Sequence, residues 1–381
     1  MTAWTLRPPP TVLRLPLRLP TPTRLGSAFT IIFIAAYAIS TGAEARKHPK
    51  NNPVTKARAA VAQPLYAQRP DAMQAADAIA QQTGLDAAWV RQAIGQARLV
   101  PAIVKAAAPP ALGTAKNWSA YRSRFVEPRR IQAGVVFWQT HRAALERAEQ
   151  AYGVPAAIIV GIIGVETLYG KQMGRYRVLD ALCTLAFDFP EAHPKAQQRA
   201  AFFRSELEAL LVLTQRQQID PLTLHGSYAG AMGLPQFMPS SWSKYALDFD
   251  GDDRIDLFHS AADVIGSVAH YFKVFGWKPG MPTHYPVQLQ AQGDAKAALL
   301  APDIVPTFSV QTLLGQGAMV QGPALLHEGP LAVVELQDGN NPAHYLVGTE
   351  NFFALTRYNW SSYYALAVIE LGQAVQDALP H

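Results

Sequence analysis

Cysteine is almost absent from this 381-residue sequence, which contains only Cys183. One cysteine excludes a disulfide within the chain and a zinc site built from several cysteines. No cysteine directly follows the apolar segment near the N-terminus, so we expect no lipoprotein anchor. The sequence also lacks a GxSxG elbow, a P-loop and an HExxH motif, which argues against serine-hydrolase, nucleotide-dependent and zinc-protease chemistry.

Acidic residues are nearly absent from the first 45 residues, which hold four arginines, no lysine and one acid, Glu44. The rest of the chain has 29 basic and 27 acidic residues, so it is nearly neutral although the whole sequence has a pI near 9.2. No basic stripe with interleaved aromatic residues is present, and we therefore expect no nucleic-acid partner.

A long membrane-spanning run is also missing. The apolar stretch "SAFTIIFIAAYAIS" offers about a dozen apolar residues, which is short for a bilayer and typical of a signal peptide. The small residues of "AEA" at 43–45 suit signal-peptidase cleavage. We expect export, in a soluble form or with membrane attachment through an uncleaved N-terminal segment.

Helical patterns dominate the remaining sequence. Gly84 ends one amphipathic stretch and Asp86 caps the next, and long helices are expected over residues 131–153 and 351–375. Between about residues 282 and 349 the helical pattern gives way to short β-type runs. There "LAVVELQ" and "HYLVGT" flank "DGNNPA", which predicts a hairpin. The sequence predicts a mainly α protein with a small β insertion.

One acid closes the most apolar segment of this body. In "AAIIVGIIGVETLYG", ten apolar or glycine residues precede Glu166. A carboxylate in an apolar site finds a partner or keeps its proton, and a proton held near neutral pH is what a general acid needs. The alternative is a helix-end glutamate that turns to solvent or pairs with Lys171 or Arg175.

Two further stretches have the composition of a sugar-binding cleft. The loop "GSYAGAMGLPQFMPSSW" combines glycines with aromatic residues and with Ser227 and Gln236, which suit hydroxyl and acetamido groups. The stretch "RYNWSSYYA" places Tyr358, Asn359 and Tyr364 close together. The alternative for each stretch is ordinary packing between helices.

The acidic stretch "DFDGDDRIDLFH" resembles an EF-hand loop. Asp248, Asp250 and Asp252 occupy positions 1, 3 and 5, Arg254 would offer its main-chain carbonyl at position 7, and Asp256 stands at position 9. Position 6 is Asp253 instead of glycine, and position 12 is His259 instead of a bidentate acid. Calcium is the predicted ion of this 248–259 loop, with sodium or no ion as alternatives. Asp263 either compensates for His259 or belongs to a capping box with Ser260.

Taken in order, six stretches resemble the membrane-bound lytic murein transglycosylase B family, whose members have a lysozyme-like core. They are "GVETLYG", "DALCTLAFDFP", "GSYAGAMGLPQFMPSSW", "DFDGDDRIDL", "DVIGSVAHYF" and "TRYNWSSYYALAV". The resemblance covers about residues 121–374 and implies a lysozyme-like α+β core plus an N-terminal helical domain. The segments expected are a signal peptide or anchor (1–45), a flexible tether (46–65), a helical domain (66–140), the lysozyme-like catalytic core (141–281), a small β domain (282–349) and a C-terminal helix completing the core (350–381).

The resemblance also implies an activity. Enzymes of this family cleave the β-1,4 bond between N-acetylmuramic acid and N-acetylglucosamine and leave 1,6-anhydromuramoyl ends, with a single acid that the motif places at Glu166. The same matching implies that the substrate-binding residues are Tyr121, Ser227, Gln236, Phe237, Tyr271, Tyr358, Asn359 and Tyr364. The partner expected is the peptidoglycan glycan strand, and the location that the resemblance implies is the periplasm. The chain is expected to be a monomer, and no cofactor is expected for the chemistry. The alternatives are a hydrolytic muramidase and an inactive peptidoglycan-binding protein.

Overall fold

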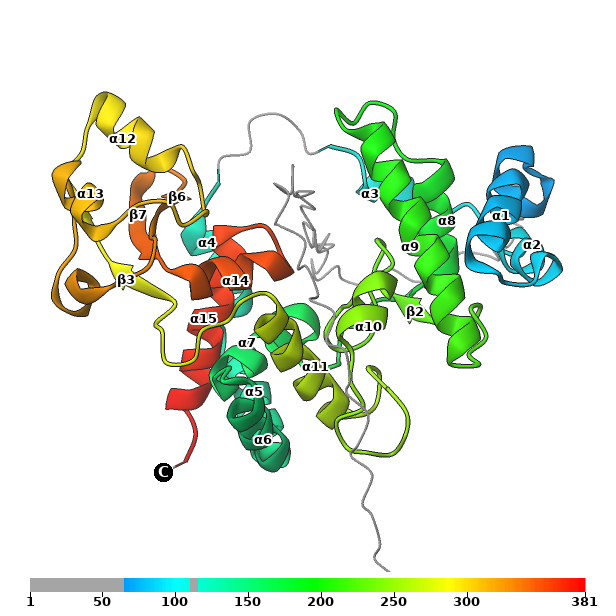
Figure 1. The fold of residues 1–381 in the computed structure, drawn as a ribbon, viewed down its shortest axis with the longest axis horizontal. Coiled ribbons are helices and arrows are strands. Elements are labelled where there is room, and N and C mark those ends of the chain that lie inside the picture. The colour runs from blue at the N-terminus through cyan, green and yellow to red at the C-terminus, as the bar shows by residue number, and fades with distance from the viewer. Residues whose placement is uncertain (1–64, 110–115, 381) are drawn as a thin grey trace, which may run out of the picture.

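The computed structural model describes residues 65–109 and 116–380. These residues form a mainly helical body with a small β region at one end (Figure 1), as the sequence predicts. The predicted signal or anchor (1–45) and residues 46–64 of the tether lie outside the described residues.

The helices of the described residues run along almost the whole chain. In order they are η1 (Tyr66–Gln68), α1 (Pro70–Thr83), α2 (Ala87–Gly95), α3 (Pro101–Ala106), α4 (Trp118–Phe125), α5 (Pro128–Thr140), α6 (Arg142–Tyr152), α7 (Ala156–Thr167), α8 (Val178–Phe187), α9 (Ala196–Arg216), α10 (Pro239–Tyr245), α11 (Ala261–Val274), α12 (Gly293–Leu300), α13 (Val310–Gly315), η2 (Gly322–Leu326), α14 (Glu350–Tyr358) and α15 (Ser362–Asp377). The predicted caps are confirmed, because Gly84 ends α1 in the left-handed region and the Asp86 side chain accepts a hydrogen bond from the third residue of its helix.

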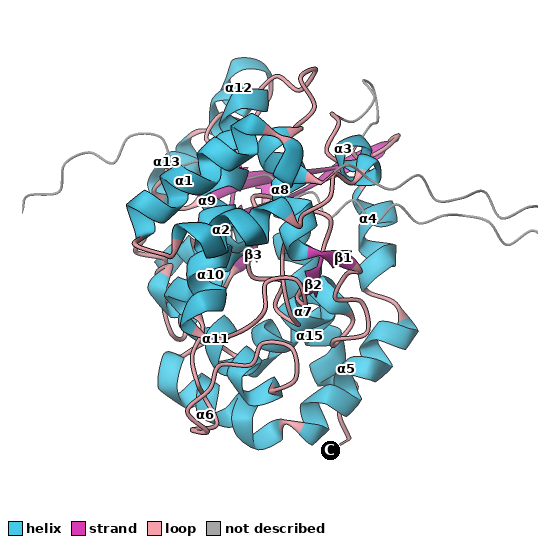
Figure 2. Ribbon diagram, turned by 90° about the vertical axis from the view of Figure 1, so that its right-hand side faces the viewer, coloured by secondary structure: helices cyan, strands magenta, loops and turns pink. Residues whose placement is uncertain are grey.

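The centre of the fold is the pair α7 and α15, which lie side by side in the second view (Figure 2). Their backbones approach closely because glycines stand at the crossing. A Cβ atom on Gly161 would lie 2.3 Å from the carbonyl oxygen of Val368, and one on Gly372 would lie 2.1 Å from that of Ala157. Helices α4, α5, α6, α11 and α14 pack around this pair. A helix that is apolar on all sides, as α7 is, therefore finds an apolar neighbour on nearly every side.

The N-terminal helices lie beside a second helix pair, α8 and α9 (Figure 1), and α3 packs against α8. Polar contacts fix this junction: Arg69 and the Tyr66 hydroxyl both bond to Asp188, each at 2.6 Å, and the backbone N–H of Arg98 donates to Asp180. Helices α4 and α5, in contrast, pack against α15.

The β region has its own small core. Its main sheet has the order β3 (His284–Pro286), β7 (Asn341–Gly348), β6 (Ala332–Asp338), all antiparallel. Val333 and Val347 join the small core, whereas Val334 and Leu346 face the large helical core, so alternate residues of β6 and β7 serve two cores. The predicted hairpin is confirmed, with its turn shortened to the two residues between Asp338 and Asn341. The remaining strands are β1 (Tyr176–Arg177), β2 (His225–Gly226), β4 (Gln288–Leu289) and β5 (Ala318–Met319).

Two predicted long helices are each divided in the structure, so the expectation of single helices was wrong. The segment 131–153 breaks at His141 between α5 and α6. The C-terminal segment breaks at residues 359–361, because the Ser361 side chain accepts a hydrogen bond from the Tyr364 N–H and starts α15 as a new helix. Among the described residues no single helix has the length and apolar character to cross a membrane; α6 and α7 pass this test only as a pair, bent by 117° at their break.

Candidate active site

Glu166 is the next-to-last residue of α7, and the chain turns sharply directly after this helix. Leu168, Tyr169 and Gly170 all have left-handed backbone angles, with φ of 50°, 55° and 84°. The Thr167 hydroxyl donates to the carbonyl oxygen of Leu234 at 3.0 Å, which ties the helix end to the glycine-rich loop 226–242. The local fold thus holds the acid at the end of a buried helix and beside that loop.

Glu166 lies on the wall of a cavity of about 870 Å³. The wall is formed by α9, loop 226–242, α10, the end of α11 and the end of α14. The lining residues are Glu166, Gln198, Ala201, Phe202, Ser205, Glu206, Ser227, Tyr228, Ala229, Ala231, Gln236, Phe237, Met238, Ser240, Ser241, Lys244, Tyr245, Tyr271, Phe275, Thr356, Arg357, Tyr358, Asn359 and Trp360. Aromatic faces and a few polar groups are the usual lining of a site for a small organic ligand or a sugar.

Burial raises the pKa of Glu166 to about 7, and the Tyr364 hydroxyl, which donates to its Oε1 atom at 2.5 Å, acts in the opposite direction. The pKa of Tyr364 is raised well above its ordinary value, mainly by burial, so this phenol remains a hydrogen-bond donor. Neither Lys171 nor Arg175 forms an ion pair with Glu166 among the described residues, and the alternative of a paired helix-end glutamate is therefore wrong. A carboxyl group with a pKa near neutrality is suited to give and take one proton.

Tyrosine and phenylalanine rings form the wall next to this acid. The Tyr358 ring is stacked 6.4 Å from that of Tyr364, and the Phe237 ring lies 5.7 Å from that of Tyr271. The hydroxyl of Tyr358 donates to the Pro235 carbonyl at 2.5 Å, and the hydroxyl of Tyr271 donates to a carbonyl of α14 at 2.6 Å. Because both hydroxyl groups already bond to the backbone, these tyrosines offer ring faces to a ligand more than they offer polar atoms.

Loop 226–242 presents two polar side chains with complementary capacity. The Ser227 Oγ atom accepts the N–H groups of Ala229 and Ala231 at 3.2 and 3.0 Å, so its own proton is left for an external acceptor. The Nε2 group of Gln236 donates to the carbonyls of Met173 and Gly233 at 3.2 and 2.9 Å, and no described residue donates to its Oε1 atom.

The predicted site residues come together with one exception. Glu166, Ser227, Gln236, Phe237, Tyr271, Tyr358 and Asn359 line the cavity, and Tyr364 contacts the acid from behind the wall. Tyr121 of α4 is not among the lining residues; its ring packs against Trp118, Phe125 and Tyr363. The charge of Glu166 nevertheless contributes to the raised pKa of Tyr121, so the two groups are near each other.

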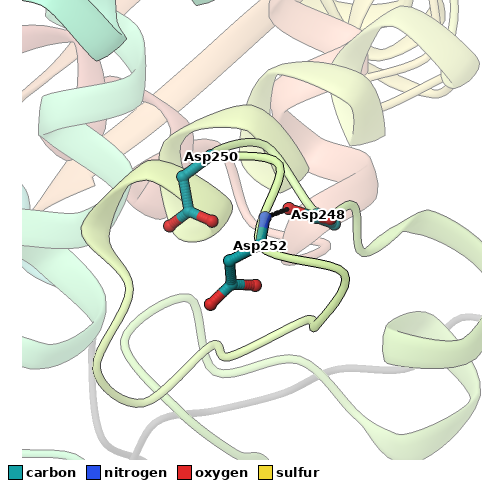
Figure 3. A group of neighbouring side chains, drawn as sticks. All are labelled: Asp248, Asp250 and Asp252. Carbon is teal, nitrogen blue, oxygen red and sulfur yellow. Dashed lines mark hydrogen bonds between the residues drawn. The ribbon is translucent and has the colours of Figure 1, made fainter.

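The acidic loop, whose three aspartates are drawn in Figure 3, directly precedes α11 and contributes no residue to the cavity lining. One carboxylate oxygen each of Asp248, Asp250 and Asp252 lies within 4.8 Å of the others. Asp248 accepts the N–H groups of residues 251, 252 and 253, which holds the loop in this shape. Both oxygens of the buried Asp263 accept backbone N–H groups, from Phe249 and Asp256.

The two residues considered for position 12 therefore have other partners. His259 bonds to Asp256 through Nδ1 at 3.0 Å. Asp263 is not one of the three acids whose oxygens converge, and its carboxylate bonds instead to the backbone N–H groups of Phe249 and Asp256. Only half of the predicted capping box is present: the Ser260 hydroxyl accepts the Asp263 N–H at 3.2 Å, but the Ser260 N–H donates to the Asp256 carbonyl and not to the Asp263 side chain.

Residues 68–373 of this chain match a family model described as "Transglycosylase SLT domain". The chain belongs to this transglycosylase family. It is 40% identical over 318 residues to the membrane-bound lytic murein transglycosylase B of Escherichia coli strain K12, covering 81% of this chain and 84% of that protein.

Solved structures agree with this assignment. The E. coli lytic transglycosylase SLT35, solved in complex with bulgecin A and also with calcium, is 41% identical with a TM-score of 0.72, covering 82% of this chain and 95% of that one. The soluble lytic transglycosylase SltB1 from Pseudomonas aeruginosa is 40% identical with the same TM-score, covering 81% and 99%. The predicted family and the predicted lysozyme-like, mainly α fold class are confirmed.

Several lining residues of this transglycosylase were not predicted from its sequence. The most informative is Glu206 of α9, which is 3% exposed and accepts two hydrogen bonds from Ser240, at 2.9 Å from its N–H and at 2.6 Å from its hydroxyl. A signal was present, because this acid stands among Phe203, Leu207 and Leu210 on the apolar face of the helix. The sequence around Lys244 and Arg357 did not single these residues out, since a basic residue with aromatic sequence neighbours is common on protein surfaces.

Proposed function

We propose that this chain is a lytic transglycosylase that cuts the β-1,4 bond between N-acetylmuramic acid and N-acetylglucosamine, with Glu166 as its single acid and base. The activity follows from the family to which the chain belongs and from its likeness to named lytic transglycosylases. The observation that carries the role of Glu166 is its position on the cavity wall with a pKa raised to about 7.

The proposed reaction has two proton transfers. Protonated Glu166 gives its proton to the glycosidic oxygen, the bond from that oxygen to C1 of the muramoyl sugar breaks, and an oxocarbenium-like centre forms. The carboxylate then takes the proton of the C6 hydroxyl of the same sugar while that oxygen bonds to C1. The products are a 1,6-anhydromuramoyl end and a free 4-hydroxyl group, and water is not consumed. Glu166 ends the cycle protonated, as it began.

The hydrogen bond from Tyr364 makes the two carboxyl oxygens of Glu166 inequivalent. Because the phenol donates to Oε1, that atom is occupied as an acceptor, and the transferable proton belongs on Oε2. Tyr364 also favours the ionised form that exists between the two transfers. Tyr364 therefore acts as a positioning residue for the acid.

Ser227 and Gln236 suit the acetamido groups of the substrate. The free hydroxyl proton of Ser227 would donate to an acetamido carbonyl, and the Oε1 atom of Gln236 would accept its N–H. We propose Phe237, Tyr271, Tyr358 and Asn359 as walls and further contacts for the sugar rings, with Tyr121 as an outer member of this set.

Glu206 is the residue that could serve as the second carboxylate of the hydrolytic alternative. Glycosidases that use water generally need a second carboxylate beside the acid, and Glu206 lines the same cavity. Both of its oxygens, however, are occupied by Ser240 at the start of α10. This arrangement favours a structural role for Glu206 and transglycosylation by Glu166 alone.

Mass spectrometry of purified murein separates these functions. We expect the wild-type enzyme to release muropeptides one water lighter than reducing-end products, and Glu166→Gln to release none while still binding glycan strands. Reducing ends from the wild-type enzyme would establish a muramidase. Binding without release by both proteins would establish an inactive binding protein.

The acidic loop fits a calcium ion. Converging oxygens of Asp248, Asp250 and Asp252 are hard ligands of the kind that calcium prefers, and the carbonyl of Arg254 would complete the set proposed from the sequence. With no acid available at position 12, we propose that water takes the remaining coordination positions. The ion would neutralise three like charges and stabilise the connection from α10 to α11.

The cell envelope is the proposed location, since the substrate lies there. We propose export by the N-terminal segment, with either cleavage or membrane attachment through it, and a monomeric enzyme. For the domains, we propose the division 66–140, 141–281, 282–349 and 350–381 as predicted. The packing described above adds that α4 and α5 lie with α15, while α3 packs against α8 and the residues just before α1 bond to Asp188.

A further inference from the structure

Arg357 lies at the rim of the cavity, between three aromatic rings. Its guanidinium carbon is 5.6 Å from the ring centre of Phe275, 5.7 Å from that of Phe353 and 5.5 Å from that of Trp360. Phe275 and Trp360 line the cavity together with Arg357. Stacking of this kind holds a guanidinium by its faces and leaves its N–H edge available.

This cation has no counterion among the described residues. No carboxylate lies within 4 Å of the Arg357 guanidinium, and none of its N–H groups donates a hydrogen bond to a described residue. The two carboxyl groups that line the cavity have other partners: Glu166 is bonded to Tyr364, and Glu206 is bonded to Ser240. An arginine that is fixed in orientation but unpaired is a ready partner for an anion from outside the chain.

The positive charge of Arg357 acts on two tyrosine phenols at this end of the cavity. It acts to lower the pKa of the Tyr245 and Tyr271 phenols, against the burial that raises both. Tyr271 also fixes the backbone here, since its hydroxyl donates to the carbonyl of Arg357 itself at 2.6 Å. The side chain and the main chain of this residue are therefore both held in place before a ligand arrives.

We propose that Arg357 is a specificity residue that binds a carboxylate of the substrate by a two-pronged hydrogen bond. This inference rests on the proposed function, because peptidoglycan is the substrate that brings carboxylates to the cavity. Two sources exist on one strand: the stem peptide, and the lactyl group of muramic acid once the peptide has been removed. The shared chemistry is a planar carboxylate, which matches the guanidinium fork.

Three glycan strands distinguish the sources. The first carries stem peptides, the second has been treated with an amidase to expose the lactyl carboxylates, and the third is the second after those carboxylates are capped as methyl amides. Release of anhydromuramoyl ends is measured on each strand as kcat/KM for the wild type, Arg357→Gln, Arg357→Lys and the control Arg216→Gln. Arg216 is an exposed cation in the last turn of α9, and its removal changes the net charge equally.

Loss of one charge-assisted hydrogen-bonded pair typically lowers binding affinity by about 10- to 100-fold. We expect Arg357→Gln to lower kcat/KM by that factor on a strand whose carboxylate it binds, and to leave the capped strand and the melting temperature unchanged. Arg357→Lys keeps the charge without the fork and should restore only part of the loss. A loss limited to the first strand identifies the stem peptide, and a loss limited to the second identifies the lactyl group.

Equal losses on all three strands would overturn the proposal, because Arg357 would then only support the aromatic wall. No loss on any strand would overturn it as well. If the wild-type protein releases no anhydromuramoyl ends at all, the proposed function fails separately. Calorimetric binding of capped and uncapped strands to the wild type and to Arg357→Gln still decides whether this residue binds a carboxylate.

Discussion

Replacing Tyr364 by phenylalanine removes the only hydrogen bond that the described residues make to the Glu166 carboxyl group without removing the ring that packs beside it. The phenol stabilises the ionised carboxylate, so its loss should raise the pKa of Glu166 above the present value of about 7. The first proton transfer needs the protonated acid. The fall of kcat/KM on the alkaline side should therefore move to higher pH in Tyr364→Phe.

The size of this change follows from the geometry. A hydrogen bond to a charged group contributes about 1.5–3 kcal/mol, and one pKa unit corresponds to about 1.4 kcal/mol. Since the phenol also bonds to the protonated carboxyl group, only part of that energy differs between the two forms, and we expect a displacement of about one pH unit. The ratio of kcat/KM at pH 8 to that at pH 6 should then rise about fivefold.

The assay is the rate of anhydromuropeptide release from pH 5 to pH 9, with substrate well below KM. Tyr358→Phe is the matched control, because its hydroxyl bonds to the Pro235 carbonyl and not to the acid. This control affects substrate binding only through the cavity wall, and its alkaline midpoint should stay at the wild-type value. An unchanged or lower midpoint in Tyr364→Phe would refute the assigned role of the phenol and the assignment of the alkaline limb to Glu166.

Three further outcomes are expected. Burial raises the pKa of Glu166 to about 7, so the ionised form destabilises the fold by about 3 kcal/mol, and this penalty develops between the unfolded-state pKa and pH 7. Glu166→Gln should therefore raise the melting temperature more at pH 8 than at pH 4. Equal shifts at the two pH values would contradict this. Glu206→Gln should lose about 1–3 kcal/mol of stability, as should Ser240→Ala, while kcat/KM falls less than tenfold; a thousandfold fall would make Glu206 a second catalytic carboxylate. Calcium at a hundred times its Kd should stabilise the wild type by about 2.7 kcal/mol in thermal melts but should not stabilise Asp248→Asn, and no shift in the wild type would argue against the site.

Helix α7, which carries the proposed acid, shows how much the local sequence predicts. An unbroken apolar run that ends on one acid predicts both a buried helix and an acid with a raised pKa, and α7 has both properties. The partner of that acid is a different matter. Tyr364 stands 198 residues further along the chain, and no spacing rule links the two positions.

The C-terminal segment shows the limit of helical periodicity. Residues 351–375 have an apolar pattern that continues through the segment, and a single helix was expected. The structure interrupts it at Asn359, because Ser361 caps a new helix and the chain at Tyr358 is held by the hydrogen bond to Pro235. This interruption turns the end of α14 toward the cavity and brings Arg357, Tyr358 and Asn359 to its wall.

The sequence by itself determined the fold class, the family, the acid proposed for catalysis, most of the predicted cavity wall and the loop with converging carboxylates. These features depend on residue type, short spacing and long ordered motifs, which are properties of neighbours along the chain. Only the tertiary structure decided that Tyr121 lies outside the lining, that Glu206 bonds to Ser240, and that Arg357 is held between aromatic rings without a counterion in the described part of the chain. Each of these depends on the packing of helices that are far apart in sequence, and the free energy of such contacts is set by burial and geometry that no local pattern contains.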